Sequence, residues 1–427
     1  MKIKFHTNSK KNDSLFLQEQ QDKLHQYFIN TINEESVGFF HITDNKEHIK
    51  KAVTIYNKFN HKKHFIQIGI GGSSLGPKML IDALSKNEYR TFTFLDNTDS
   101  DYIYDELSKI SLVDSLFYVV SKSGATAETM AIFAICRNLL SQAGISEDDY
   151  NQYFVFSTDP LSSDLKELSD EKGFNTLVVP TNIGGRFSVL TSVGLLPALF
   201  ANIDIKRLYE GANSIKEELL SKDITNPLLK TATELAYAYN QSETQVNQTV
   251  LMPYSSKLKN LSHWFVQLWG ESLGKYSQEK KMHTGLTPIP AYGATDQHSQ
   301  MQLFMEGPND KFILLIDIEN RSNDFSLDNT IGKKSSNALC GYTLNQLIKA
   351  QLNGTLKALK DKKRNVALIS IKENDEYNIG RLILFLESLT CLMGYYLSIN
   401  PFDQPGVELG KKYAYEYLAK EKLQSIE

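Results

Sequence analysis

Residues 64–77 read HFIQIGIGGSSLGP, a short apolar run that leads through a glycine- and serine-rich turn into a helical pattern. The β-branched and aromatic residues of 64–70 are typical of a buried strand. Glycines let backbone N–H groups approach a ligand closely, and the partial positive charge at a helix start favours an anion. This segment therefore predicts a strand, a tight turn and a helix, with the turn as a candidate anion site.

The same order of strand and helix repeats along the chain. Further apolar runs of four to six residues lie at 92–96, 117–121, 153–158 and 177–180, and helical patterns lie between them at 77–84, 127–143 and 161–172. Strands that alternate with helices indicate a parallel sheet covered on both faces. We expect this first α/β domain to span residues 46–200.

A second α/β pattern occupies residues 205–395. Its expected strands are 249–254, 288–293, 312–318 and 365–371, and its expected helices are 205–220, 228–239, 258–275, 295–306, 344–363 and 378–397. Two domains agree with the length of 427 residues, because single hydrophobic cores stop growing at roughly 250–300 residues. Residues 1–45 are expected to form an N-terminal arm with a helix near 15–32, and residues 396–427 a C-terminal helix.

Composition excludes several classes of protein. The 46 basic and 50 acidic residues give a net charge of −4, so no basic surface attracts nucleic acid or an anionic membrane. Nowhere do 18 uncharged apolar residues run together, the three cysteines are too few for a disulfide framework, and the histidines lack metal-binding spacing. We expect a cytoplasmic protein with no metal, no cofactor, no nucleic-acid partner and no membrane partner.

A second polar loop follows the run at 117–121 and precedes a helical pattern. It contains four candidates for phosphate contact: Ser121, Lys122, Ser123 and Thr126. Hydroxyls at a helix start can simply cap the helix, but three of them with a glycine and a lysine exceed what capping requires. With the glycine turn, the loop predicts binding of a small phosphate monoester. A dinucleotide site is not supported, because Ser74 stands at the third glycine position of G-x-G-x-x-G, and no Walker A pattern is present.

A third loop, TNIGGRFS at 181–188, follows the last strand of the first domain. Its two glycines precede Arg186, which can point into the crevice above the sheet. There a guanidinium could stabilise an oxyanion. The alternative is an ordinary surface arginine.

Three further residues are acid–base candidates. Gln267 and Glu271 lie four residues apart on the flank of the apolar stripe of helix 258–275, where Glu271 can act as a general base or be an ordinary boundary glutamate. His298 is expected in the first turn of helix 295–306, with Thr295 as the N-cap, and can relay a proton or simply pack. Lys411 lies on the C-terminal helix 407–423, where a solvated lysine is the simplest interpretation.

Six segments occur in one order along the chain: IGIGGSSLGP, VVSKSGATAET, GGRFSVLTSVGLLP, WGESLGK, GATDQHSQMQLFMEGP and FDQPGVELGK. Together they closely resemble the glucose-6-phosphate isomerase (phosphoglucose isomerase) family in its shorter bacterial form, over about residues 60–415. The resemblance implies two SIS-type three-layer α/β/α sandwich domains with mostly parallel sheets. It also implies the reversible isomerisation of D-glucose 6-phosphate and D-fructose 6-phosphate in glycolysis and gluconeogenesis, through a cis-enediol(ate) and without metal or nucleotide.

The resemblance also assigns roles to residues. It makes Glu271 the base that moves the proton between C2 and C1, Arg186 the group that stabilises the enediolate, and His298 and Lys411 the pair that opens the sugar ring. The contacts that it implies with the substrate are those of Gly72, Ser73, Ser121, Lys122, Ser123, Thr126, Gln267 and Gln404. In this family the histidine comes from the other subunit, which implies a homodimer with His298 shared across the interface.

Two departures from longer family members affect only fine substrate contacts: Gly124-Ala125 in the hydroxyl loop and Pro405 in the last segment. The alternative from another class is a non-catalytic SIS-type regulator that binds sugar phosphates. Such a regulator would keep the hydroxyl loops but could dispense with Glu271, His298 and Lys411. A second alternative is an isomerase that also accepts mannose 6-phosphate.

Overall fold

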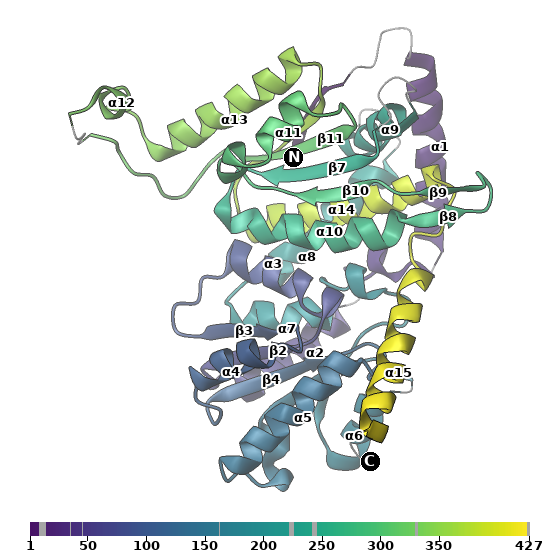
Figure 1. Cartoon of the computed structure of the whole chain (residues 1–427), viewed down its shortest axis with the longest axis vertical. Helices are drawn as coiled ribbons and strands as arrows, with labels where there is room; N and C mark the ends of the chain where they lie inside the picture. The colour runs from purple at the N-terminus through teal and green to yellow at the C-terminus, as the bar shows by residue number, and fades with distance from the viewer. Residues whose placement is uncertain are drawn as a thin grey trace.

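The computed structural model describes residues 1–7, 14–34, 36–44, 46–161, 163–221, 226–240, 246–328 and 332–424. It contains two five-stranded sheets, and helices cover both faces of each. The sheets lie one above the other along the long axis, with helices between them (Figure 1). The chain is thus an α/β protein built from two three-layer sandwiches, as the alternating pattern of strands and helices predicts.

The first sheet has the order β3-β2-β4-β5-β6, and its strands are all parallel. They are β2 (His64–Ile68), β3 (Thr91–Leu95), β4 (Ser115–Val120), β5 (Phe154–Thr158) and β6 (Asn175–Val178). One face is covered by α4 (Ser100–Ser108), α5 (Ala127–Gln142) and α6 (Asp164–Lys172), and the other by α2 (Glu47–Phe59) and α7 (Ser192–Phe200). Ile66 and Phe117 pack on the first face, and Phe65 and Tyr118 on the second, because successive strand residues point to opposite sides.

The second sheet has the order β1-β12-β11-β7-β10. Its parallel strands are β7 (Gln248–Pro253), β10 (Thr287–Pro290), β11 (Lys311–Ile318) and β12 (Asn365–Ile371). One face is covered by α11 (Met301–Glu306) and α13 (Leu344–Asp361), which follows the short α12 (Lys334–Asn337). The other is covered by α8 (Ile205–Leu220), α9 (Pro227–Asn240), α10 (Lys259–Leu273) and α14 (Glu376–Tyr396).

The N-terminal segment belongs to this second sheet. β1 (Lys2–His6) pairs antiparallel with β12, and α1 (Ser14–Asn33) packs on α9 and α14. The sequence predicts the helix but not the strand. Ile3 and Phe5 face the core while Lys2 and Lys4 are exposed, and this alternation is the strand signal that a polar composition conceals.

The two sandwiches share a core. Met79 and Leu80 of α3 (Leu75–Leu84) belong to the same buried cluster as Trp264 and Phe265 of α10. The helix α14 is long and apolar enough to cross a membrane, but most of its length is buried beneath the second sheet, which is typical of the core helix of a globular domain. Packing between α3 and α10 fixes the loops of the first sheet relative to the second.

Residues 295–306 do not form one helix, and the prediction of Thr295 as the N-cap is wrong. A 3₁₀ turn spans Thr295–His298 with Ala294 before it, and α11 begins only at Met301. Asp296 explains the tight turn, because its carboxylate accepts hydrogen bonds from the Tyr292 N–H at 2.8 Å and from the Ser299 hydroxyl at 2.6 Å. The chain then leaves helical geometry at Ser299.

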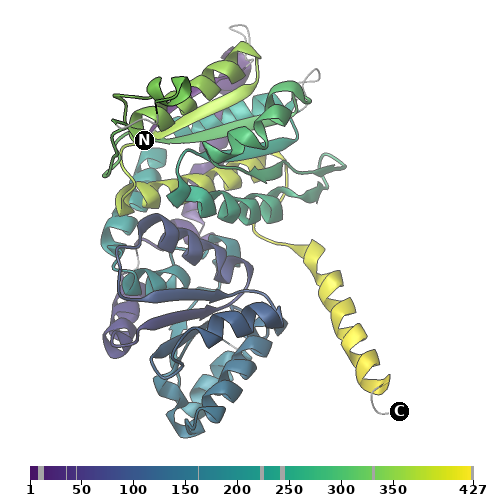
Figure 2. The ribbon, with the colours of Figure 1, turned by 60° about the vertical axis from the view of Figure 1, so that its left-hand side comes forward.

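A two-stranded hairpin and the last helix both project from the body near the candidate site. The strands β8 (Lys275–Ser277) and β9 (Met282–Thr284) form a hairpin at the end of α10. The helix α15 (Glu408–Gln424) extends from the second domain alongside the first, and Figure 2 shows it standing clear of the rest of the chain. Its described side chains are exposed.

Candidate active site

The glycine turn and the hydroxyl loop lie side by side at the carboxyl edge of the first sheet. They follow β2 and β4, which are adjacent and parallel, and a Cβ atom at Gly69 would sit 2.8 Å from the carbonyl oxygen of Val120. Gly71 has a φ of +59°, in the left-handed region that favours glycine. The carboxyl edge of a parallel sheet is where such folds bind ligands.

The hydroxyls of the second loop contact one another and leave the helix uncapped. Thr126 is the N-cap residue of α5, yet its side chain accepts no cap hydrogen bond. Its Oγ1 atom instead lies 2.9 Å from Ser121 Oγ and 3.4 Å from Ser123 Oγ. The capping interpretation is therefore not what the structure shows. Three hydroxyls cluster at a helix N-terminus, where an anion is favoured.

The Lys122 ammonium contacts a different loop from these hydroxyls. Its Nζ atom donates to the carbonyl oxygens of Thr181 at 2.7 Å and Ile183 at 2.9 Å. Burial lowers the pKa of this ammonium, and the Asp159 carboxylate opposes the shift. The Lys122 side chain thus ties the hydroxyl loop to the loop that carries Arg186.

The glycine turn and the arginine loop are in backbone contact. A Cβ atom at Gly72 would lie 2.1 Å from the carbonyl oxygen of Gly185, and one at Gly71 would lie 2.8 Å from Gln267 Nε2. Ser73, half-buried, ends the 3₁₀ turn Gly71–Ser73. Glycine at position 72 is thus required by close approach, which brings the Arg186 loop and α10 against the glycine turn.

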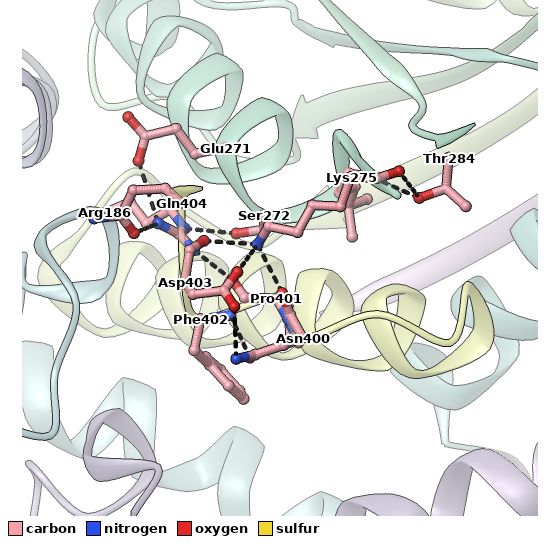
Figure 3. A network of polar contacts seen from close by, with 11 residues as sticks. Arg186, Glu271, Ser272, Lys275, Thr284, Asn400, Pro401, Phe402, Asp403 and Gln404 are labelled. Atoms are coloured by element: carbon pink, nitrogen blue, oxygen red, sulfur yellow. Dashed lines mark hydrogen bonds and ion pairs between the residues drawn. The ribbon is translucent and has the colours of Figure 1, made fainter. Parts of the chain in front are cut away.

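Arg186 is the centre of the site and is almost completely buried. Its Nε donates to Ser272 Oγ at 2.7 Å, and its Nη1 donates to Gln404 Oε1 at 2.8 Å and to Glu271 Oε2 at 3.3 Å. Its Nη2 donates to the carbonyl oxygens of Pro401 and Asp403 (Figure 3). Burial lowers the pKa of Arg186, and the Glu271 carboxylate opposes that effect. A buried guanidinium with a full set of acceptors is held in one orientation.

Glu271 lies in the last turn of α10, with Gln267 one turn before it. Gln267 Nε2 donates to Glu271 Oε1 at 3.0 Å, so one carboxylate oxygen contacts Gln267 and the other contacts Arg186. The spacing of four residues predicts this contact. Gln267 Oε1 is buried and has no hydrogen-bond partner among the described residues, which leaves one acceptor for a ligand hydroxyl.

Three residues of this network escape the sequence prediction: Ser272, Lys275 and Asp403. Lys275 Nζ donates to the carbonyl oxygens of Asn400 at 2.7 Å and Asp403 at 2.6 Å, and forms an ion pair with Asp403 Oδ1 at 2.9 Å (Figure 3). All three residues lie inside the quoted segments WGESLGK and FDQPGVELGK. Those segments were the available signal, but nothing in their local chemistry singles out these members.

A cavity of about 810 Å³ opens onto this network. Glu271, Lys275, Asp403 and Gln404 line it together with His283 and Tyr276 of the β8–β9 hairpin. A volume of this size suits a small phosphorylated sugar. Of these lining residues, Glu271 contacts Arg186 and Gln267, and Gln404 contacts Arg186. Gln267 and the arginine loop in turn lie against the glycine turn at Gly71 and Gly72.

His298 is not part of this group within the chain. Lys259 at the start of α10 has its Nζ 5.3 Å from the centroid of the Tyr292 ring, whereas Gly270 near the end of α10 lies beside Pro288. The turn that carries His298 follows Tyr292, so it lies at the end of α10 opposite Glu271. The twelve residues from Lys259 to Glu271 span about 18 Å of helix. The His298 side chain is exposed there.

Lys411 is not part of the group either. It lies in the first turn of α15, and its Nζ pairs with Glu408 Oε1 at 2.9 Å on the surface of the helix. Large apolar side chains of α15 are also exposed to solvent, among them Leu409, Tyr413, Tyr417 and Leu418. A helix with so much exposed apolar surface is typical of one that packs against another molecule.

Comparisons with known proteins converge on one family. The family model for phosphoglucose isomerase matches residues 40–426. A glucose-6-phosphate isomerase of Carboxydothermus hydrogenoformans is 37% identical over 404 residues, which cover 90% of this chain and 85% of that protein. The crystal structure of a hypothetical protein from Thermus thermophilus superposes with a TM-score of 0.90 at 33% identity, covering 98% of this chain and 100% of that one. A glucose-6-phosphate isomerase structure from Chlamydia trachomatis shares the fold, with a TM-score of 0.84 at 22% identity, over 98% of this chain and 88% of that one.

Proposed function

The chain belongs to the phosphoglucose isomerase family, and from that premise we propose that it interconverts D-glucose 6-phosphate and D-fructose 6-phosphate. The observation that carries the proposal is the contact of a carboxylate with a buried guanidinium at the wall of a cavity. Glu271 Oε2 and Arg186 Nη1 are 3.3 Å apart, and Gln267 and Gln404 flank them. A base beside a fixed cation is what proton transfer next to a carbonyl requires.

The proposed reaction step is a proton transfer through an enediolate. The Glu271 carboxylate removes the proton from C2 of the open-chain aldose, and the electron pair of that C–H bond forms the C1–C2 double bond. Negative charge develops on O1, where the Arg186 guanidinium stabilises it. The proton on O2 passes to O1, and Glu271 returns its proton to C1 as O2 becomes the ketose carbonyl.

The phosphate is assigned to the first sheet. The hydroxyls of Ser121, Ser123 and Thr126 with the backbone of Lys122 form one side of the proposed phosphate site, and Gly72 and Ser73 the other. Binding a group remote from the reacting carbons positions C1 and C2 against Glu271. The Gln267 Oε1 atom, which has no partner among the described residues, and the Gln404 amide are assigned to sugar hydroxyls.

Ring opening is assigned to His298 and Lys411, which implies a homodimer. His298 lies at the far end of α10 from Glu271, so a second copy must supply the histidine if it acts at this site. The exposed apolar side chains of α15 support burial of that helix in the dimer, which would bring Lys411 toward the cavity. We expect the dimer to have twofold symmetry.

We also propose that the protein acts in the cytoplasm. An isomerase of these two hexose phosphates serves glycolysis and gluconeogenesis. The cysteines Cys136, Cys340 and Cys391 are free thiols, as expected in the reducing cytoplasm.

The test is turnover of fructose 6-phosphate by the purified protein after EDTA treatment, coupled to NADPH formation by glucose-6-phosphate dehydrogenase. Rapid NADPH formation supports a metal-free isomerase. Absence of turnover with sugar-phosphate binding intact would favour a non-catalytic regulator and overturn the assignments of Glu271 and Arg186. Parallel turnover of mannose 6-phosphate shows whether the second hexose is also a substrate.

A further inference from the structure

The lysine at the start of β8 connects two parts of the candidate site. Lys275 lies four residues after Glu271, and its side chain is only 9% exposed although it carries a charge. Its three contacts all fall on the turn at 400–403. A buried ammonium with three acceptors on one turn holds that turn in place.

The turn held by Lys275 is the turn that orients Arg186. The carbonyl oxygen of Asp403 accepts one hydrogen bond from Lys275 Nζ at 2.6 Å and another from Arg186 Nη2 at 2.9 Å. The carbonyl oxygen of Pro401 takes the other Nη2 proton. Two cations thus donate to one carbonyl oxygen (Figure 3). A movement of that carbonyl would change the hydrogen bonds of both Lys275 and Arg186.

The five N–H bonds of Arg186 divide into two sets. Three of them meet acceptors supplied by the protein framework: Ser272 Oγ and the carbonyls of Pro401 and Asp403. The remaining two, on Nη1, meet the side chains of Glu271 and Gln404 at the cavity wall. The first set fixes the plane of the guanidinium, and the second set is the edge that a developing oxyanion can use.

We propose that Lys275 is a positioning residue for the isomerisation: by holding the 400–403 turn it fixes the plane of the Arg186 guanidinium, and it thereby favours the enediolate over the ground-state sugar. This inference rests on the proposed function and assigns a role to a residue that the proposed mechanism does not use. The hydrogen bonds and the ion pair of the Lys275 ammonium are with Asn400 and Asp403, so it acts on Arg186 through the turn and not directly.

The inference predicts that loss of Lys275 affects the binding of two kinds of ligand differently. The proposed phosphate contacts lie on the first sheet and outside the 400–403 turn, so we expect the binding of a ground-state analogue to depend little on Lys275. An analogue with negative charge at C1–C2 depends on the Arg186 plane. The matched probes are D-glucitol 6-phosphate, which is neutral at these carbons, and 5-phospho-D-arabinonate, which places a carboxylate there.

The experiment measures the dissociation constants of both probes by calorimetry for the full-length parent and for Lys275→Met, which keeps chain length and removes all three donors. We expect Lys275→Met to raise the dissociation constant of 5-phospho-D-arabinonate by about tenfold or more and to lower kcat by a similar factor. The KM and the dissociation constant of D-glucitol 6-phosphate should change by less than about threefold. Lys275→Arg, which keeps charge and donors, should recover part of the loss.

The control is Lys280→Met in the same hairpin. Lys280 Nζ also donates to a carbonyl oxygen, that of Tyr396 at 2.6 Å, but it does not contact the 400–403 turn. We expect this variant to bind both probes as the parent does. If Lys275→Met does not fold, Asp403→Asn replaces it, because it breaks the ion pair and keeps the shared carbonyl. The quantity to compare is the ratio of the two dissociation constants, 5-phospho-D-arabinonate over D-glucitol 6-phosphate. A smaller increase of this ratio in Asp403→Asn supports the inference, and an unchanged ratio overturns it.

Two results would overturn the positioning role while leaving the proposed function intact. Equal weakening of both probes by Lys275→Met means that the lysine only stabilises the fold, and unchanged binding of both means that the turn holds Arg186 without it. In both cases the parent still isomerises fructose 6-phosphate. Failure of the parent to turn over that sugar overturns the proposed function itself and, with it, this inference.

Discussion

The Arg186 guanidinium and the Glu271 carboxylate meet at 3.3 Å, but their side chains are exposed to very different degrees, 1% and 33%. The cation is enclosed by three fixed acceptors, whereas the carboxylate reaches the cavity from the last turn of a helix. A long contact between a fixed and a more accessible partner is one that a substrate can replace. Arg186 therefore serves as the rigid electrostatic group, and Glu271 as the base that reaches the substrate.

The first prediction concerns the base. Glu271→Gln keeps the shape of the side chain and one oxygen that can accept a hydrogen bond from Arg186 or Gln267, but an amide cannot accept the C2 proton. We expect kcat to fall by about 10²–10⁴-fold, the usual contribution of a positioned acid or base. The coupled assay with fructose 6-phosphate gives the rate, and calorimetry with D-glucitol 6-phosphate serves as the control for binding, which should survive. Comparable turnover by the variant would remove Glu271 from the mechanism.

The second prediction concerns the shared histidine. In a symmetric dimer with composite sites, His298→Ala and Glu271→Gln are each inactive, but a mixed dimer contains one site with both native residues. Co-expression in equal amounts makes about half of the dimers mixed. About a quarter of the parent activity should therefore return in the unfractionated mixture, and about half in the purified mixed dimer, where one of the two sites is intact.

The readout is the activity of mixed dimers purified through two different affinity tags, compared with each variant alone. A site built from one chain leaves every mixed-dimer site with one defective residue, so its activity would stay at the level of the single variants. That result would place both residues in one subunit or assign His298 to packing.

The fold follows from local patterns to a large extent, and the exceptions have identifiable causes. The apolar runs from His64 to Val178 predict every strand of the first sheet, because each run is short, buried and flanked by turn residues. The strand at Lys2–His6 is missed because a single edge strand is stabilised by its partner, β12, and carries little apolar sequence of its own.

In the candidate site, too, local contacts are predictable from the sequence and long-range contacts are not. Gln267 and Glu271 are predicted to meet because helical spacing is a local property, and their contact is present at 3.0 Å. The contact between Lys275 and Asp403 joins residues 128 positions apart, and only the folded chain reveals it. Long-range pairs of this kind depend on how the domains pack, which no window of sequence contains.

The third prediction concerns the glycine turn. A Cβ atom at Gly72 would lie 2.1 Å from the Gly185 carbonyl oxygen, so Gly72→Ala must push the Arg186 loop away from the turn. We expect a loss of about 1–3 kcal/mol in the free energy of unfolding and a lower kcat/KM, measured by urea denaturation and the coupled assay.

Gly185→Ala is the matched control, because a Cβ atom at that position meets nothing within 4 Å. It alters the other side of the same backbone contact without filling the space between the loops. We expect its stability and activity to stay close to those of the parent. Equal losses in both variants would show that backbone freedom, and not close approach, is the reason for glycine at these positions.

The fourth prediction rests on a carboxyl group outside the candidate site. Glu387 of α14 is fully enclosed, and its Oε1 atom has no hydrogen-bond partner among the described residues. Burial raises the pKa of this carboxyl well above its usual value. The folded protein therefore holds a proton that the unfolded chain releases above about pH 4.3, so this group destabilises the fold as pH rises from there toward the raised pKa.

Glu387→Gln removes that dependence, because the amide stays neutral at every pH. At about pH 4, where the carboxyl is largely protonated in both states, we expect the variant and the parent to unfold at similar urea concentrations. Between about pH 4.3 and the raised pKa the parent should lose stability by up to about 1.4 kcal/mol per pH unit relative to the variant. Urea titrations of both proteins from about pH 4 to 8 measure the difference. A constant difference across this range would show that Glu387 is already ionised in the folded protein, with a partner that compensates its burial.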